Sequence, residues 1–349
     1  MNLKFVWQSF TDYHKWALAL ALIVVAGMTG VSFLLGLSVL VLVGVTISYL
    51  EPLRASLGPA RSYYRAARLG RKGRFRECLE TTASYLEGHP RDGRAYELRA
   101  LALTGLGRHE EALSDADRGV SWKRRWQGLM IRGQNLLFLA CPSAALEDLE
   151  ASYKIRAHPY TRMLMGQVFA SLRRMDTATN ILERSTRSVR FSLTFASLAD
   201  CYRLLGDHDR AQKTYREAAK KARREVSSGM PCASVLAYCL AQLLHDEEAA
   251  AAINAALERD SRDALAHRTE ALLSLRRGDV DVVETTIRQM LLISPQSAVS
   301  TLFDPQFTPL LRENRFGLLL AWSLGAQRQI VERVLNRRGA QGISAADST

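Results

Sequence analysis

Asp207, His208 and Asp209 are adjacent in the stretch GDHDRAQKTYREAA, which begins at Gly206. Aspartate and histidine bind metals and exchange protons, so this triplet is the first place to look for chemistry. Three neighbouring side chains, however, point in different directions from the backbone and converge poorly on one ion. Whether the triplet forms a site therefore depends on the elements that position it.

No other motif in the chain supplies a reaction centre. GRKGRF lacks the spacing and the final Lys-Ser/Thr of a phosphate-binding loop, and no HExxH motif occurs. The sequence therefore predicts no catalytic residue, no metal site and no cofactor, and we expect that the protein is not an enzyme.

The cysteines indicate a compartment rather than a site. Their number is odd and they form no CxxC pair, unlike the paired spacing of zinc sites: Cys78, Cys141, Cys201, Cys232 and Cys239. Single buried thiols in a reducing compartment are expected, which favours a domain that faces the cytosol.

The net charge is strongly positive. The 349 residues include 47 Lys plus Arg and 35 Asp plus Glu, which gives a formal net charge of +12. Such a balance is typical of proteins with anionic partners, namely lipid head groups, nucleic acid or acidic proteins.

A long uncharged segment near the N-terminus predicts a membrane anchor over residues 1–52. Trp16–Leu50 contains no charged side chain. As one helix it would measure about 52 Å, whereas a bilayer core is about 30 Å thick. GMTG at Gly27–Gly30 can turn the chain, so we expect two short spans, about Tyr13–Met28 and Val31–Leu50. A single tilted span and a cleaved signal peptide are the alternatives.

The flank that follows this segment predicts its orientation. Eight basic residues and no acidic residue lie between Pro52 and Arg76. The positive-inside rule then places the C-terminal domain in the cytoplasm, at a bacterial inner membrane. Five of the basic residues are expected to lie against anionic membrane lipids, four of them on one helical face: Arg54, Arg61, Arg65, Arg68 and Lys72.

The rest of the chain repeats every 33 to 38 residues. Each repeat has a turn followed by a small residue, as in GRFREC from Gly73, GRHEEA from Gly107 and GDVDVV from Gly278. The small residues follow one another at intervals of 34, 33, 33, 33, 38 and 34 residues: Cys78, Ala112, Ala145, Ala178, Ala211, Ala249 and Val283. The 38-residue interval predicts a longer second helix before a break at Ser227–Pro231.

This pattern resembles the tetratricopeptide repeat, whose period is 34 residues. The best copy matches the family pattern at seven positions: Leu198, Ala199, Tyr202, Gly206, Ala211, Tyr215 and Ala218. The resemblance covers about Pro59–Pro295 in seven repeats. It implies an all-α fold in which helix pairs stack into a right-handed superhelical solenoid, here over residues 53–297.

The repeat places the Asp-His-Asp triplet at the turn between the two helices of a pair. Phe75, His109, Met175 and Val280 hold the place of His208 in other repeats. A packing position explains that set better than a ligand does, and Asp207 is placed to cap the following helix. We therefore interpret the triplet as structural.

Residues 298–338 resemble a segment that often follows such arrays. Its motif is Asp-Pro, Phe, Pro-Leu and Arg-Phe: Asp304, Pro305, Phe307, Pro309, Leu310, Arg315 and Phe316. The expected role is a C-terminal cap with one further amphipathic helix over the apolar end of the solenoid. A disordered tail is expected over residues 339–349.

The resemblance also implies a binding groove. In this family the first helices line a concave surface that takes a peptide or protein partner. The residues expected there are Arg94, Glu97, Gln127, Met130, Gln134, Tyr160, Met163, Gln167, Asp200, Arg203, Tyr238 and Arg268. WKRRW, from Trp122 to Trp126, lies at a junction between repeats, where packed tryptophans with solvated cations are expected.

The sequence therefore predicts a membrane-anchored scaffold that binds a protein partner through this groove. The alternatives are an envelope assembly factor for secretion or polysaccharide export, with a periplasmic solenoid, and a nucleic-acid-binding regulator favoured only by the charge.

Overall fold

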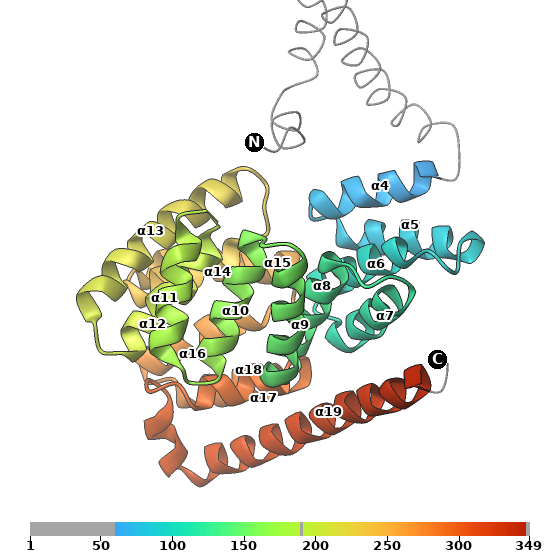
Figure 1. The fold of residues 1–349 in the computed structure, drawn as a ribbon. Coiled ribbons are helices and arrows are strands. Elements are labelled where there is room, and N and C mark those ends of the chain that lie inside the picture. The colour runs from blue at the N-terminus through green and yellow to red at the C-terminus, as the bar shows by residue number, and fades with distance from the viewer. Residues whose placement is uncertain (1–59, 189–190, 347–349) are drawn as a thin grey trace, which may run out of the picture. The chain divides into compact units, whose positions relative to one another are not determined.

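The computed structural model describes residues 60–188 and 191–346. It divides into two compact units, Met1–Ala66 and Ala67–Thr349. The described residues form sixteen α-helices and one 3₁₀ helix, with no β-strand (Figure 1). The all-α prediction is confirmed for this part of the chain, whereas the predicted spans within Trp16–Leu50 lie outside it.

Fourteen of these helices form seven antiparallel pairs, as the repeat predicted. The first helices are α4 Ala60–Arg71, α6 Gly93–Gly105, α8 Trp126–Phe138, α10 Pro159–Ser171, α12 Ser192–Leu204, α14 Ala233–Gln242 and α16 Ala264–Arg277. The second helices are α5 Phe75–Gly88, α7 His109–Trp122, α9 Pro142–Ile155, α11 Met175–Thr186, α13 His208–Ser227, α15 Asp246–Arg259 and α17 Val280–Ile293. The helix α13 is the predicted longer one, with 20 residues.

The small residue after each turn is where the two helices of a pair meet. All seven are buried: Cys78, Ala112, Ala145, Ala178, Ala211, Ala249 and Val283. The predicted spacing is therefore confirmed as a packing period. Leu149 and Leu182 pack closely against Gly133 and Gly166 of their own pairs. Buried apolar residues of several repeats form one cluster, so the apolar core runs along the stack.

Every one of the seven turns contains one residue with a left-handed backbone. Four turns use glycine for it, including Gly206 with φ 82°. The other three use Ala140, Arg173 and Leu244, with φ of 60–63°. Since a Cβ atom is strained in this conformation, the last three turns store an energy that the glycine turns avoid.

Leu244→Gly is expected to raise the free energy of unfolding by about 0.5–1 kcal/mol, because strain relief of about 1–2 kcal/mol exceeds the added chain entropy. The Leu244 side chain is 72 % exposed, so little packing is lost. Gly206→Ala is the matched opposite change and is expected to lower the free energy of unfolding. A Cβ atom added at this position meets no neighbouring atom, so only the left-handed φ is unfavourable. Urea denaturation checks both signs, and a destabilised Leu244→Gly variant would contradict the strain argument.

Buried ion pairs join the helices of the second and third repeats. Arg99 of α6 donates to Asp115 of α7 at 2.6 and 2.7 Å. One repeat later, Arg132 of α8 donates to Asp148 of α9 twice at 2.7 Å. Arg132 also reaches Asp117 of α7 at 3.2 Å, so it ties three consecutive helices together.

Three elements close the C-terminal end: α18 Pro295–Leu302, η1 Thr308–Arg312 and α19 Asn314–Ala346. Phe307, Leu310 and Phe316 are buried against the seventh repeat. The helix α19 continues to Ala346, through most of the segment predicted to be disordered from residue 339.

The second unit also makes contacts between repeats far apart in sequence. The backbone N–H of Ala140, in the third turn, donates to Gln296 of α18 at 2.9 Å. α19 runs back from the cap toward α7 (Figure 1), where Arg333 pairs with Glu110 at 2.8 Å. The turns of the first three repeats thus face the late repeats and the cap.

Candidate functional site

The inner surface of the solenoid contains a cavity of about 660 Å³. Its lining comes mainly from the first helices α8, α10, α12, α14 and α16, together with α18 and α19. Six of the residues predicted for the partner groove meet there: Gln134, Tyr160, Gln167, Asp200, Arg203 and Arg268.

A column of polar side chains crosses this cavity at one position per repeat. Gln134, Gln167 and Asp200 are spaced by 33 residues and lie on α8, α10 and α12. The Gln134 amide donates to the Tyr160 hydroxyl at 3.3 Å, and the Gln167 amide donates to Ser197 at 2.9 Å. Amides can also bond a peptide backbone, which offers one donor and one acceptor per residue.

Apolar side chains form much of the remaining lining, beside polar residues such as Arg173, Ser300 and Gln327. They include Leu164, Leu193, Leu204, Val235 and Phe303. Phe303 and Leu193 are still substantially exposed, as Phe138 is at the same cavity. An apolar hollow with a few polar groups is the kind of surface that binds an extended or helical segment.

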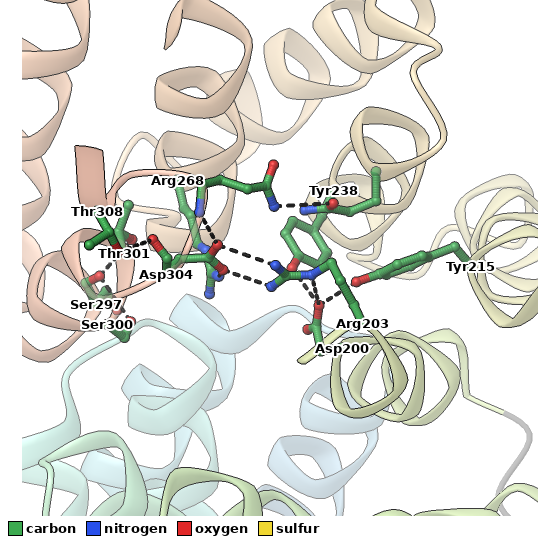
Figure 2. Close-up of polar contacts among 12 residues, drawn as sticks. Asp200, Arg203, Tyr215, Tyr238, Arg268, Ser297, Ser300, Thr301, Asp304 and Thr308 are labelled. Carbon is green, nitrogen blue, oxygen red and sulfur yellow. Dashed lines mark hydrogen bonds and ion pairs between the residues drawn. The ribbon is translucent and has the colours of Figure 1, made fainter. Parts of the chain in front are cut away.

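One end of the cavity holds a network of charges and tyrosines (Figure 2). The hydroxyls of Tyr215 and Tyr238 donate to the same Asp200 oxygen, at 2.5 and 2.6 Å. Burial first, and then the nearby Asp200 charge, raises the pKa of both tyrosines, so both stay protonated and keep donating. Arg203 lies 3.8 Å from the same carboxylate. Asp200 is therefore held in a fixed position at the wall.

Asp304, from the C-terminal cap, enters the same network. Its carboxylate accepts from Arg203 at 2.7 Å and from Arg268 at 2.8 Å, as Figure 2 shows. Burial acts to raise the pKa of Asp304, but the hydrogen bond and charge of Arg203, and then Arg268, outweigh it and leave that pKa below its usual value. The two arginines of the groove are thus occupied by the chain itself.

The sequence did not predict this contact, because the motif around Asp304 indicated a cap alone. A signal existed. Asp304 lies in an apolar segment, and a buried aspartate needs cationic partners. Nothing in the sequence pointed to residues 101 and 36 positions earlier.

The other predicted groove residues do not line the cavity. Met163 is fully buried and its sulfur contacts Thr194 at 3.0 Å. Glu97 is buried and bonded to Arg125. Tyr238 is buried behind Asp200. Arg94 is exposed at the start of α6, and Gln127 and Met130 are half-buried on α8. Binding roles for the whole set stay predictions.

The predicted lipid-facing residues lie mostly on α4. Arg61, Arg65 and Arg68 lie on this helix and are exposed, and Lys72 is exposed just after it. Arg54 lies outside the described residues. None of the helices in the described residues is both long and apolar enough to span a bilayer.

The Asp-His-Asp triplet lies at the fifth turn, as predicted. Asp207 caps α13 by accepting the Arg210 backbone N–H at 3.0 Å. His208 is the first residue of α13, as Phe75, His109, Met175 and Val280 are of their helices. It is exposed, so packing does not explain this histidine, although the other four are partly buried. Within the described residues, no group of three potential ligands could hold a metal ion.

His208→Phe is expected to change the free energy of unfolding by no more than about 0.5 kcal/mol, because the site is exposed and phenylalanine occurs naturally at the same place in the first repeat. Ala211→Trp is expected to cost about 1–3 kcal/mol, because the alanine lies between two packed helices. Thermal unfolding followed by circular dichroism separates the two. If His208→Phe removes partner binding while the fold stays intact, the structural interpretation of the triplet is wrong.

Two further predictions concern the cysteines, expected to be buried, and the tryptophans of WKRRW, expected to be packed. Four of the five cysteines are buried, and Cys232 is half-buried. WKRRW does join α7 to α8, but Trp122 is 51 % exposed rather than packed. Trp126 stacks on His158 at 4.8 Å between ring centres.

Comparisons with known proteins identify the repeat in one part of the chain. Residues 194–220, which form most of α12 and α13, match a family model described as tetratricopeptide repeat. This segment contains the copy with the best family pattern. The match supports a protein-interaction scaffold of the tetratricopeptide type. No curated protein matches the chain.

Several solved structures are similar at low sequence identity. The tetratricopeptide protein TTC0263 of Thermus thermophilus is 20% identical with a TM-score of 0.46, and the match covers 54% of this chain and all of that one. A chain of the APC/C hetero-tetramer Cut9-Hcn1 is 14% identical with a TM-score of 0.48, covering 74% of this chain and 48% of that one. MamA 41-end from Desulfovibrio magneticus RS-1 is 16% identical with a TM-score of 0.39, covering 48% and 96%.

Proposed function

We propose that this protein is a membrane-tethered scaffold that holds a segment of a partner protein in its inner cavity. The observation that carries the proposal is the cavity itself, in which a column of amides and a carboxylate crosses an apolar lining. Amides satisfy the backbone of a bound segment, and the apolar walls take its side chains. The network around Asp200 and Asp304 fixes one end of the cavity, so the surface is largely preformed.

The cavity is tested with Gln134→Ala/Gln167→Ala in the full-length chain. The two losses are expected to reduce the partner recovered by affinity purification about tenfold, since each hydrogen bond contributes about 0.5–1.5 kcal/mol. Gln212→Ala/Gln329→Ala is the control, because both residues are exposed on α13 and α19. A photo-crosslinking residue at position 167 should capture the same protein, and one at position 212 should not. Equal recovery with both double variants contradicts the proposal.

The tether rests on the uncharged segment and its basic flank. The buried free thiols of Cys78, Cys201 and Cys239 support a cytoplasmic position, and the exposed arginines of α4 suit an anionic membrane surface. Reporter fusions at Met1 and after Pro59 test the topology. Both are expected to be active only in the cytoplasm. A fusion after Pro59 that is active only in the periplasm would place the scaffold in the envelope instead.

A further inference from the structure

The two edges of the solenoid differ in chemistry. Because the helices of a pair are antiparallel, the turns within pairs lie on one edge, and the junctions between pairs lie on the other. We name the second one the junction edge. On the turn edge of the later repeats, exposed carboxylates mix with arginines: Asp176, Asp209, Glu247, Glu248, Asp279 and Asp281.

The junction edge is basic and apolar instead. Four successive junction segments contain no acidic residue: Ser121–Arg125, Lys154–His158, Arg184–Ser188 and Val226–Cys232. Their exposed cations are Lys123, Arg124, Lys154, Arg156, Arg184 and Arg187, with Arg224 next to the fourth segment. Cations suit the C-terminal ends of helices, which these segments follow, so the charges alone need no ligand.

Helix ends do not explain the apolar side chains that accompany these cations. Trp122 is 51 % exposed, Ile155 is 53 % exposed and Phe191 is 45 % exposed, one at each of three junctions. Val226 and Met230 are exposed at the fourth. Scattered exposed apolar residues are ordinary, but at least one lies at each of these four successive cationic junctions, on the same edge of the solenoid.

Contacts hold these residues in place along the edge. Arg91, from the preceding junction, lies over the Trp122 ring at 5.8 Å. Glu225 accepts the backbone N–H of Ser192 at 2.9 Å, and its own carbonyl accepts the N–H of Met230 at 2.9 Å. Through Glu225, hydrogen bonds therefore connect the backbone next to Phe191 with the loop that contains Val226 and Met230.

The long-range contacts of the second unit decide which part of the edge is free. Gly73, in the first turn, shares a cavity with Pro231 and Arg259, and Gly107, in the second turn, shares another with Arg262 and Leu292. Early turns therefore cover Pro231, at the end of the fourth junction, and the junctions that follow it. The junctions from Trp122 to Met230 keep their exposed side chains.

We propose that the junction edge from Trp122 to Met230 docks on an anionic lipid bilayer. Arginine and lysine pair with lipid phosphates, while Trp122, Ile155, Phe191 and Met230 enter the interface between head groups and acyl chains. Nucleic acid fits less well, because Ile155, Val226 and Met230 have no ring on which a base can stack. The inference deepens the proposed function, since a tether and a docked edge together fix the orientation of the scaffold.

Hydrogen exchange tests the docking with the full chain in nanodiscs, of either anionic or purely zwitterionic lipid. Peptides that cover the junctions at 121–126, 153–158 and 224–232 are expected to exchange about tenfold more slowly in the anionic discs alone. Added salt should remove the difference. Peptides from the turns at 205–210 and 244–249 are the internal control and should not change.

Substitutions on each edge distinguish docking through the junction edge from a general effect of lipid on hydrogen exchange. Trp122→Ser/Ile155→Ser/Phe191→Ser should abolish the protection, whereas Leu205→Ser/Leu244→Ser, on the turn edge, should leave it unchanged. Equal exchange in both kinds of disc overturns the proposal. The proposal is also overturned if the chain binds single-stranded DNA and the triple variant does not, because the edge is then a nucleic-acid-binding surface.

The same experiment distinguishes failure of the tether from failure of the docking. If the chain does not incorporate into discs, the tether is wrong, and the edge is then tested by flotation of the chain with anionic vesicles. If the chain incorporates and the junction peptides are unprotected, the docking is wrong and the tether stands.

Discussion

Arg132→Ala is expected to lower the free energy of unfolding by about 3–5 kcal/mol, the usual cost of removing one partner from a buried ion pair. Arg132 reaches Asp148 at 2.7 Å and Asp117 at 3.2 Å, and both carboxylates are about 5 % exposed. Without the guanidinium, two aspartates on α7 and α9 lose the cation that offsets their burial. The measurement is urea denaturation of the full chain, followed by circular dichroism.

Two controls make this result specific. Arg216→Ala removes an exposed arginine whose side chain bonds to Gln212 on the same helix, and it should change stability by no more than about 0.5 kcal/mol. Arg132→Leu/Asp117→Asn/Asp148→Asn removes all three charges together, and it should recover most of the loss. A loss below about 1 kcal/mol for Arg132→Ala means that the pairs contribute little.

Asp304→Ala is expected to cost about 3 kcal/mol or more, because it leaves Arg203 and Arg268 without the carboxylate that both of them share. The effect should be largest at the C-terminal end, where Asp304 fastens the cap to α12 and α16. Limited proteolysis should therefore cut the segment around α18 and α19 earlier than in the original protein. Asp209→Ala is the control, since that aspartate is exposed on α13. If the cap resists protease as before, the network does not hold it.

The ion pairs of Asp304 with Arg203 and Arg268 also predict that the stability of the fold depends on pH. The pKa of Asp304 is lower in the folded protein than in the unfolded chain, because Arg203 and Arg268 favour the carboxylate. Its contribution is therefore fully present above the unfolded pKa of about 3.9, and it is lost as the pH falls through the folded value. In acid, the difference in stability between the original protein and Asp304→Asn should shrink.

The repeat could be predicted because its period is carried by local residues. Ala112, Ala178 and Ala211 are small for a reason that operates within a single helix pair, so their spacing gives the number of pairs and the position of the turns. The exposed His208 shows the limit of the argument: its repeat position was right, but equivalent positions need not be equally buried. The use of Ala140, Arg173 and Leu244 at left-handed positions follows the turn geometry, which overrides what these residues prefer.

The far contacts could not be predicted in the same way. The meeting of Asp304 with Arg203 depends on the small rotation between successive pairs, summed over several repeats, and no local pattern specifies that sum. For the same reason Met163 and Glu97, counted into the groove by repeat position, are buried between helices. Six of the twelve predicted groove residues line the cavity, and Met130 and Met163 do not, although they lie on the same first helices as Gln134 and Gln167.

The contact between Ala140 and Gln296 has a consequence for how the chain folds. In an open array each repeat touches only its neighbours, so folding can spread outward from any point and the ends fray first. A bond across 156 residues raises the mean sequence separation of the native contacts, and such topologies fold more slowly. The final step must close a long loop, whose entropic cost grows only slowly with length. Once the loop is closed, the C-terminal elements cannot unfold without breaking a contact to the third repeat, and the array from Ala140 to Gln296 gains cooperativity of the kind found in a globular domain.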